Sequence, residues 1–412
     1  MRWSRSLSIS TCMAVVLTLL GPSPARAQEP IRVGFMGPLS GIFAQVGKDM
    51  LEGLQLGLDS AGGAVAGRKI ELIAEDIEGQ TATAVSKYRK LTTQDRIDVL
   101  VGLLLVNTGY ALAPSIERDQ LPSLYLTTPD DLTKRRRAQW ILRSSFAASQ
   151  PMHAFGDHAA RVLKYRRVAT IALDNGYGHE QTGGFQKVFE GHGGKVVQKL
   201  WYPLNALDFA PYIAQIRRDV DAVLAVTVGA QAIRFFQQYD TSTLKGKVPL
   251  ITSGVSTDVV HLRALTTEPV GVVSALNWAP AVNNPANVEF VKLMQAKVGK
   301  VPSLYHMCMY SAGRWIVEGA RLADGNVADR KKFLTGIRRA AETIPDPRGP
   351  LKFDEYGNPT QNIYILKTEL EGERPRNAVL HTYPMVSQFW TWSPEEFLKQ
   401  PAYTRDYPPP SE

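Results

Sequence analysis

Short hydrophobic runs alternate with longer amphipathic segments along the first part of the chain. The runs predicted to be strands lie at residues 31–36, 69–73, 99–102 and 123–127. Between them, hydrophobic residues recur with the period of a helix at about residues 47–61 and 82–93, and again between the last two strands. Strands that alternate with helices of roughly ten to sixteen residues indicate βαβ units, so we predict a parallel sheet flanked by helices.

The same alternation starts again after residue 143. Strands are predicted at residues 168–173, 195–201, 222–228, 248–252 and 270–276. Helices are predicted between them near residues 181–190, 209–218 and 230–239. Helices then dominate residues 287–341, and the tail adds strands at 362–367 and 379–382 and a short helix at 394–399. No low-complexity linker separates the two series, which predicts an α/β fold with two similar lobes, joined by several short crossings and facing one cleft.

The N-terminus has the pattern of an export signal. Arg2 and Arg5 precede a hydrophobic run at residues 9–20, and Ala25-Arg26-Ala27 supplies small residues at a cleavage site. The run is short for a helix that spans a membrane, which makes an N-terminal anchor the weaker alternative. We therefore predict cleavage after Ala27 and export to the periplasm.

Composition and charge exclude several classes of protein. The chain has 412 residues, of which 44% are hydrophobic and 21% charged, as in an ordinary globular protein. The formal net charge is +8, but no basic run is interleaved with aromatic residues, so no nucleic-acid partner is expected. The densest basic cluster, residues 134–137, is predicted to be a solvated loop. Cys308 is alone once the signal is removed, and we expect a buried, unreactive thiol.

The usual motifs of catalysis are missing from the sequence. The glycine-rich segment at residues 62–69 leads into a strand and lacks the Lys-Ser/Thr pair of a phosphate-binding loop. Residues 191–194 end a helix, and His179-Glu180 lacks the second histidine of a zinc helix. No Gly-x-Ser-x-Gly motif is present. We expect a binding protein with no cofactor and no metal ion, not an enzyme, although acid–base chemistry on Asp174 or Asp258 stays an alternative.

Several motifs resemble those of a known family in both kind and order. Residues 31–41, Ile-Arg-Val-Gly-Phe-Met-Gly-Pro-Leu-Ser-Gly, resemble the first strand and loop of periplasmic solute-binding proteins of the branched-chain amino acid type, which serve ABC importers. Val101-Gly102, Arg143, and residues 174–178 and 349–357 fall where that family has similar motifs. The resemblance covers roughly residues 30–366.

The resemblance implies a fold, a role and partners. The family has two Rossmann-like lobes, joined by three hinge crossings, that close on a small solute. By analogy, one lobe would take residues 28–144 plus 278–356, and the other residues 145–277 plus 357–412. The implied partners are a small-molecule solute and an inner-membrane ABC permease, and the protein is expected to be a monomer. A periplasmic sensor that serves a signalling partner would use the same fold and stays an alternative.

Ligands of open parallel sheets bind beyond the carboxyl ends of the strands. This rule selects the loops at residues 39–43, 105–109 and 127–129 in one lobe, and 175–178, 227–230 and 253–256 in the other. The candidate ligand-binding residues on these loops and after the strand at 270–276 are Ser40, Phe43, Val106, Asn107, Thr108, Thr127, Thr128, Tyr177, Val228, Gly229, Gly254 and Trp278.

The types of these residues suit an acidic, flat solute. Asn107 and Thr108 begin a helix whose free N–H groups favour a carboxylate, although they can equally serve as caps. The hydroxyls of Thr127 and Thr128 could donate further hydrogen bonds. Phe43 and Tyr177 could stack on a ring. Trp278 could line the hinge side, with core packing as its alternative.

One departure from the family pattern concerns the ammonium group of an amino acid. The resemblance implies an acid in the loop that follows residue 252, but Gly254 stands near that position. A buried ammonium without a carboxylate is costly. We therefore expect a non-amino organic acid, best an aromatic one such as a benzoate or coumarate derivative. The tail at residues 388–399 also resembles that of aromatic-acid binders. A branched-chain amino acid or an amide remains the alternative ligand.

Overall fold

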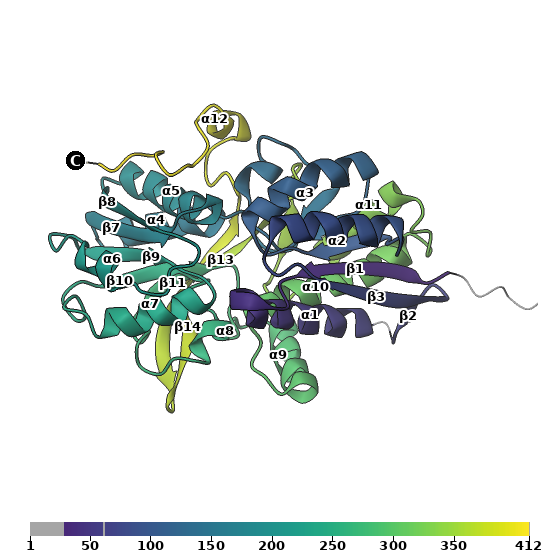
Figure 1. Ribbon diagram of the computed structural model, residues 1–412, viewed down its shortest axis with the longest axis horizontal. Coiled ribbons are helices and arrows are strands. Elements are labelled where there is room, and N and C mark those ends of the chain that lie inside the picture. The colour runs from purple at the N-terminus through teal and green to yellow at the C-terminus, as the bar shows by residue number, and fades with distance from the viewer. Residues whose placement is uncertain (1–28, 61, 412) are drawn as a thin grey trace, which may run out of the picture.

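The computed structural model describes residues 29–60 and 62–411 and divides them between two sheets with their helices (Figure 1). The predicted export signal and its cleavage site lie outside the described residues. Within this described part, no helix combines the length and the hydrophobicity that a membrane span requires.

The first sheet is built as the alternating pattern predicts. Its described strands, in spatial order, are β2 (Ala64–Val65), β3 (Arg68–Asp76), β1 (Ile31–Gly37), β4 (Val99–Gly102), β5 (Ser123–Tyr125) and β6 (Ile141–Arg143). All neighbours are parallel except the short hairpin of β2 and β3. The central strand β4 is buried along its whole length, which is why it reads as a continuous hydrophobic run.

Helices from two distant parts of the chain cover this sheet. They are α1 (Ala44–Asp59), α2 (Thr81–Thr93), α3 (Val106–Asp119), α9 (Pro285–Val298), α10 (Leu304–Leu322) and α11 (Arg330–Thr343), with single 3₁₀ turns η1 (Gly41–Phe43) and η2 (Asp130–Thr133). Helices α1 and α10 pack closely because Gly53 and Gly57 have no side chain. A Cβ at Gly53 would lie 2.3 Å from the carbonyl oxygen of His306. We call these elements and the first sheet the first lobe.

The second sheet is mixed, whereas the sequence analysis expected a parallel one. Its described strands, in order, are β12 (Leu351–Phe353), β13 (Pro359–Glu371), β11 (Val273–Leu276), β10 (Leu250–Ser253), β9 (Ala222–Val226), β7 (Arg167–Leu173) and β8 (Lys195–Tyr202), and β14 (Arg374–Val386) pairs with β13. The strands from β7 to β11 are parallel, but β13 pairs antiparallel with β11, β12 and β14. The tail therefore adds a long hairpin to the edge of the predicted parallel sheet.

The second lobe consists of this sheet and the helices around it. These are α4 (Gln150–Arg161), α5 (Gly176–Gly191), α6 (Ala210–Ala214), α7 (Ala230–Asp240) and α8 (Val259–Leu262), and α12 (Pro394–Leu398) lies in the tail. Helix α4 was not predicted. Residues 150–160 are all buried, and the polar residues His153 and Asp157, which share one face, are covered by Tyr403 and Tyr383 of the tail.

The basic cluster at residues 134–137 is not the solvated loop that was expected. Lys134 is fully buried, and its ammonium group contacts Asp130 at 2.8 Å and lies 4.5 Å from the centre of the Phe397 ring. Arg136 and Arg137 are exposed but lie over the rings of Tyr110 and Tyr356, respectively. Each charge of this run thus has its own partner, and most of these partners are distant in sequence.

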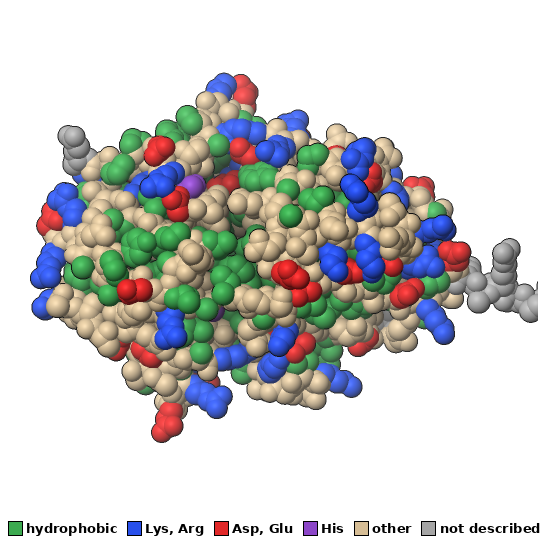
Figure 2. Space-filling model, in the orientation of Figure 1, with side chains coloured by type: hydrophobic (Ala, Val, Ile, Leu, Met, Phe, Trp, Pro, Cys, Tyr) green, Lys and Arg blue, Asp and Glu red, His purple; other side chains and the backbone are tan. Residues whose placement is uncertain are grey.

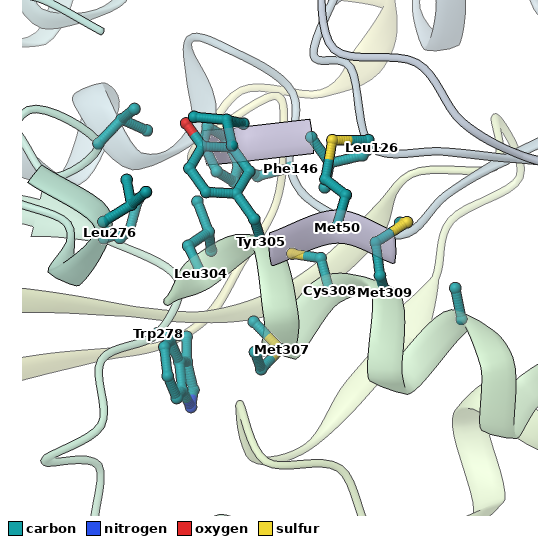
Figure 3. Close-up of a cluster of buried hydrophobic side chains, with 14 of the residues drawn as sticks. Met50, Leu126, Phe146, Leu276, Trp278, Leu304, Tyr305, Met307, Cys308 and Met309 are labelled. Carbon is teal, nitrogen blue, oxygen red and sulfur yellow. The ribbon is translucent and has the colours of Figure 1, made fainter. Parts of the chain in front are cut away.

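The chain passes between the lobes three times, and the hydrophobic core is continuous across the passages. The passages follow β6, β11 and α11. One buried cluster includes Val33 and Val101 of the first sheet and Ile171 and Val223 of the second. Figure 3 shows side chains of this cluster, which converge from α1, from the first passage and from the start of α10. Cys308, on α10, is buried among them, as predicted.

Candidate functional site

A pocket lies between the two lobes, beyond the carboxyl ends of both sets of parallel strands. Its empty space, together with the part that is open to solvent, is about 550 Å³. Its lining is formed by Phe43, Leu104, Leu105, Val106, Leu126, Thr128, Ser145, Phe146, Leu173, Asn175, Tyr177, Val228, Val255, Leu304 and Tyr305. Hydrophobic side chains also gather between the lobes on the face drawn in Figure 2. The pocket is therefore mainly hydrophobic, with polar atoms at a few positions.

The first lobe contributes the N-terminus of α3 and the loop after β5. Leu105 is the extended residue before the helix, and the first helical hydrogen bond runs from the Gly109 N–H to the Leu105 carbonyl (3.1 Å). The N–H groups of the first turn consequently have no acceptor within the helix. Thr128 lines the pocket beside this turn, and the Thr128 carbonyl accepts a hydrogen bond from the Ala148 N–H (2.9 Å).

The second lobe contributes the N-terminus of α5. Asn175 caps this helix, because its Oδ1 accepts a hydrogen bond from the Gly178 N–H at 3.1 Å. The Tyr177 hydroxyl and the Ser253 hydroxyl are hydrogen-bonded to each other at 3.2 Å. Burial raises the pKa of Tyr177 above its usual range, so the phenol is neutral. This end of the pocket offers uncharged polar groups.

The structure brings five of the predicted residues to the pocket. They are Phe43, Val106, Thr128, Tyr177 and Val228. Their loops come from both lobes, as the rule on strand ends requires. The lobes touch here, because the ring of Phe43 in the first lobe lies against Gly229 (φ +63°) in the second lobe. A Cβ at Gly229 would lie 2.9 Å from that ring.

The other seven predicted residues lie outside the lining, and Thr108, Gly229 and Trp278 among them have evident structural roles. Asn107 is exposed, whereas Thr108 is fully buried with its hydroxyl 3.3 Å from that of Thr81. The Gly229 N–H donates to Nε2 of His261 at 2.9 Å. The indole N–H of Trp278 donates to Asn287 Oδ1 at 2.8 Å inside the core, so its alternative, core packing, is correct.

The remaining residues outside the lining are Ser40, Thr127 and Gly254. Ser40 is exposed, and Thr127 is buried with a hydroxyl that has no partner within the described structure. Gly254 packs against the next strand, since a Cβ there would lie 2.5 Å from the Ala275 carbonyl oxygen and 2.5 Å from the Cβ of Leu276. The position where the resemblance implies an acid thus has no room for a side chain.

This packing gives a testable prediction. The Gly254→Ala substitution should lower the free energy of unfolding by about 1–3 kcal/mol, because backbone and Leu276 must move to admit the methyl group. Urea unfolding measures the change. Gly191→Ala is the matched control, since a Cβ at Gly191 meets nothing within 4 Å. Equal stability of the two variants would show that strand β11 does not confine residue 254.

Several lining residues escaped the sequence analysis. Ser145 and Phe146 lie on the first passage between the lobes, and Leu304 and Tyr305 lie on the first turn of α10. Leu104, Leu126 and Leu173 also lie outside the selected loops, whereas Leu105, Asn175 and Val255 lie on these loops but were not named as candidates. The first turn of α10 carries a local signal, the cap residue Ser303, whose side chain accepts from the His306 N–H. That signal marks a helix start but gives no hint that the turn faces a pocket.

No aspartate, glutamate, lysine, arginine or histidine occurs in the lining that the described residues form. The nearest candidate acid, Asp258, instead caps α8. Its two carboxylate oxygens accept the N–H groups of Val260 (3.0 Å) and Leu304 (2.8 Å). Burial raises the pKa of this carboxyl to about 6. Asp258 therefore joins the second lobe to the turn that carries Leu304 and Tyr305, and its carboxylate lies outside the pocket lining.

A charged cluster on α1 and α10 does not need an ion to balance it. Oxygens of Asp49 and Glu52 and a ring nitrogen of His306 lie within 4.8 Å of one another. Asp49 pairs with Arg263 at 2.9 Å, and Glu52 pairs with Lys300 at 2.8 Å. The hydrogen bond from His306 to Glu52 and the Lys300 ammonium hold the pKa of the Glu52 carboxyl at about 2, against the opposing effect of burial. The cluster is an ion-pair network between helices.

Similar proteins of known structure bind small solutes for ABC transporters. An ABC transporter substrate-binding protein from Sphaerobacter thermophilus is 31% identical, with a TM-score of 0.81 over 87% of this chain and 99% of that one. A solute-binding protein of an ABC transporter from R. palustris, solved in complex with benzoate, is 27% identical, with a TM-score of 0.81 over 87% of this chain and 97% of that one.

A curated relative and a family model agree with these structures. The Leu/Ile/Val-binding protein homolog 6 of Brucella melitensis is 25% identical over 360 residues, which are 85% of this chain and 90% of that protein. The model of the periplasmic binding protein family matches residues 30–373. With two α/β lobes and a pocket between them, the chain belongs to the periplasmic binding protein family, whose relatives here are solute-binding proteins of ABC transporters.

Proposed function

We propose that the protein captures a small aromatic carboxylate in the periplasm and delivers it to an inner-membrane ABC permease. The observation that carries this proposal is the uncharged lining of the pocket. A zwitterionic amino acid needs a partner for its ammonium group as well as for its carboxylate. The carboxyl of Asp258 is occupied by backbone N–H groups, and Gly254 supplies no acid.

A lone carboxylate has suitable partners in the first lobe. The N–H groups at the start of α3 carry the positive end of the helix dipole, and a carboxylate there requires no arginine or lysine. The Thr128 hydroxyl lines the same side and can donate a further hydrogen bond. We place the carboxylate between these donors.

The rest of the lining suits a flat ring. Phe43, Phe146, Tyr177 and Tyr305 contribute aromatic side chains from four separate segments. Aromatic rings pair favourably in offset or edge-to-face geometry. The benzoate complex of the R. palustris relative and the complex of a 26% identical relative with 3,4-dihydroxybenzoic acid support this ligand class.

Capture would proceed by closure of the lobes around the solute. The proposed boundaries of the first lobe are residues 28–144 and 278–350, and the second lobe takes residues 145–277 and 351–412. The third boundary lies before β12, earlier than residue 356, because β12 pairs with β13 of the second sheet.

The first test is thermal unfolding of refolded, ligand-free mature protein with a panel of solutes. Benzoate, 4-hydroxybenzoate or coumarate at a hundred times its dissociation constant should add about 2.7 kcal/mol to the free energy of unfolding. Leucine, valine and short dicarboxylates should add nothing. Stabilisation by leucine or valine alone would refute the proposal and favour the second candidate, branched-chain amino acid binding, which the name of the Brucella relative suggests.

A second test concerns the proposed carboxylate donor. The Thr128→Val substitution should weaken benzoate binding roughly tenfold or more, because a hydrogen bond to a charged group is lost. Calorimetric titration measures the dissociation constant. Thr108→Val is the matched control, since Thr108 is buried in the same lobe but outside the lining. A larger effect at Thr108 than at Thr128 would place the carboxylate elsewhere.

A further inference from the structure

The chain ends in a segment that touches both lobes. This segment, residues 387–411, follows β14, contains α12 and runs along the top of the molecule in Figure 1. We call it the C-terminal strap. The match to the family model ends at residue 373, so the strap lies beyond it.

The beginning of the strap is fixed to the first lobe. The Gln388 amide donates to the Thr133 carbonyl (2.8 Å) and accepts from the Thr133 hydroxyl (3.0 Å). Phe397 is buried on α12 beneath the ammonium group of Lys134. Arg135 donates to the carbonyl oxygen of Gln400. All three partners lie on η2 or directly after it, between β5 and β6.

The end of the strap is fixed to the second lobe. The Tyr403 hydroxyl and the His153 ring of α4 form a hydrogen bond of 3.2 Å. The Tyr403 ring packs on α5 at Gly183, where a Cβ would lie 2.5 Å from the ring. The Ser411 N–H donates to the Val196 carbonyl of β8 at 2.8 Å. The strap thus contacts two helices and a strand of this lobe.

Between these two attachments, the strap covers a place where the lobes meet directly. Glu180 of α5 accepts the Asp130 N–H (3.1 Å) and the Tyr110 hydroxyl (3.3 Å), both from the first lobe. Phe397 and Tyr403 line a small cavity together with Asp130 and Glu180. The strap lies over this contact.

We propose that the C-terminal strap restrains opening of the lobes and so slows release of the bound solute. Tyr403 follows Phe397 by only six positions in the chain, and a fully extended chain of that length spans at most about 21 Å. The two rings also pack against each other, with their centroids 6.2 Å apart. Opening that separates η2 from α5 must therefore pull these rings apart or detach one of them from its lobe. A contact that exists only while the lobes are close shifts the population toward the closed form.

This inference rests on the proposed function for its effect on the solute, but its effect on lobe opening does not. The central experiment removes residues 402–412. This removes the contacts of Tyr403 and Ser411 with the second lobe, and leaves α12 and the contacts of Trp392 and Gln400 with Lys187 in place. Small-angle X-ray scattering of the ligand-free protein should show a larger radius of gyration than the full mature chain. Stopped-flow release of benzoate should be roughly tenfold faster.

Two point variants test the inference even if the shortened chain fails to fold. Tyr403→Ala should reproduce both changes, because it removes the ring that packs on Gly183. Arg405→Ala is the control, since the Arg405 side chain is 56% exposed and an ion pair with such a side chain contributes little. It should leave both the radius and the release rate unchanged.

Three results would overturn the inference. One is a folded Tyr403→Ala protein with an unchanged radius and a release rate within twofold of the parent. Another is slower release, which would mean that the strap opposes closure. The third is an equal effect of Arg405→Ala. A wild-type protein that binds no aromatic acid would refute the proposed function alone, because the scattering comparison needs no ligand.

Discussion

Replacing Arg143 with methionine is expected to lower the free energy of unfolding by about 3–5 kcal/mol. The guanidinium group is fully buried at the first passage between the lobes. It donates to Asn358 Oδ1 (2.8 Å), to the carbonyls of Thr127 (2.6 Å) and Pro129 (2.8 Å), and to the Thr133 hydroxyl (2.8 Å). Methionine fills a similar volume but leaves these four acceptors buried without a donor, which is the source of the loss.

Denaturant unfolding of the variant measures this loss. Arg143→Lys should recover only part of it, because one ammonium group cannot reproduce the planar fork of donors. Arg136→Met is the exposed control and should change stability by less than about 0.5 kcal/mol. Similar unfolding curves for Arg143→Met and Arg136→Met would contradict the prediction. The carbonyls of Thr127 and Pro129, which accept hydrogen bonds from Arg143, flank Thr128. Benzoate affinity should therefore also fall in the folded Arg143→Met protein.

Acidification is expected to cost roughly 3 kcal/mol of stability through His261 alone, between pH 6.5 and pH 4. His261 is buried, and burial lowers the pKa of its ring to about 4. Nε2 accepts the Gly229 N–H (2.9 Å), so Nδ1 carries the hydrogen and donates to the Val255 carbonyl (2.9 Å). A second proton would face the Gly229 N–H and break this bond.

The sign follows from the protons that each state binds. Between pH 6.5 and pH 4 the unfolded chain protonates His261 and the folded chain does not, so stability rises with pH and is lost on acidification. Asp258 acts in the opposite direction, because its raised pKa of about 6 lets the folded state bind the extra proton between about pH 4 and pH 6. The contribution of His261 to stability must therefore be measured as the difference between the wild type and a variant without this histidine.

Urea unfolding of the wild type and of His261→Gln across this pH range provides that difference. The wild type should lose stability more steeply than the variant as the pH falls from 6.5 to 4. Parallel profiles would mean that the folded state protonates His261 without penalty. His381→Gln is a suitable control, because His381 is exposed at the sheet edge on β14.

Much of the fold was predictable from the sequence because its signals are local. The periods of hydrophobic residues located β1, β3, β4 and β7, and glycines and polar residues marked the ends of these strands. The sequence analysis missed α4, whose polar residues His153 and Asp157 are covered by the tail, and it failed where charges find partners distant in sequence. Lys134 is buried rather than solvated because Phe397 of the tail covers it.

The candidate site was predictable only in outline. The alternating order of strands and helices determined which loops end at the cleft, and this order alone directed attention to Phe43, Val106, Thr128, Tyr177 and Val228. Which of the neighbouring side chains face the pocket was decided by tertiary packing. Thr127 and Thr128 are adjacent in sequence, yet only Thr128 lines the pocket, since the Thr127 side chain packs against Gly109 of α3.

The sequence by itself determined the α/β architecture, the two lobes and the absence of an acid at residue 254. Only the tertiary structure decided that the Asp258 carboxylate accepts the Leu304 N–H. It also decided that Ser145, Phe146 and Tyr305 complete the pocket, and that the tail joins both lobes. The physical reason is the range of the interactions. Periodicity and capping act within a few residues, whereas a pocket between lobes is formed by segments far apart in the chain, whose proximity no local pattern encodes.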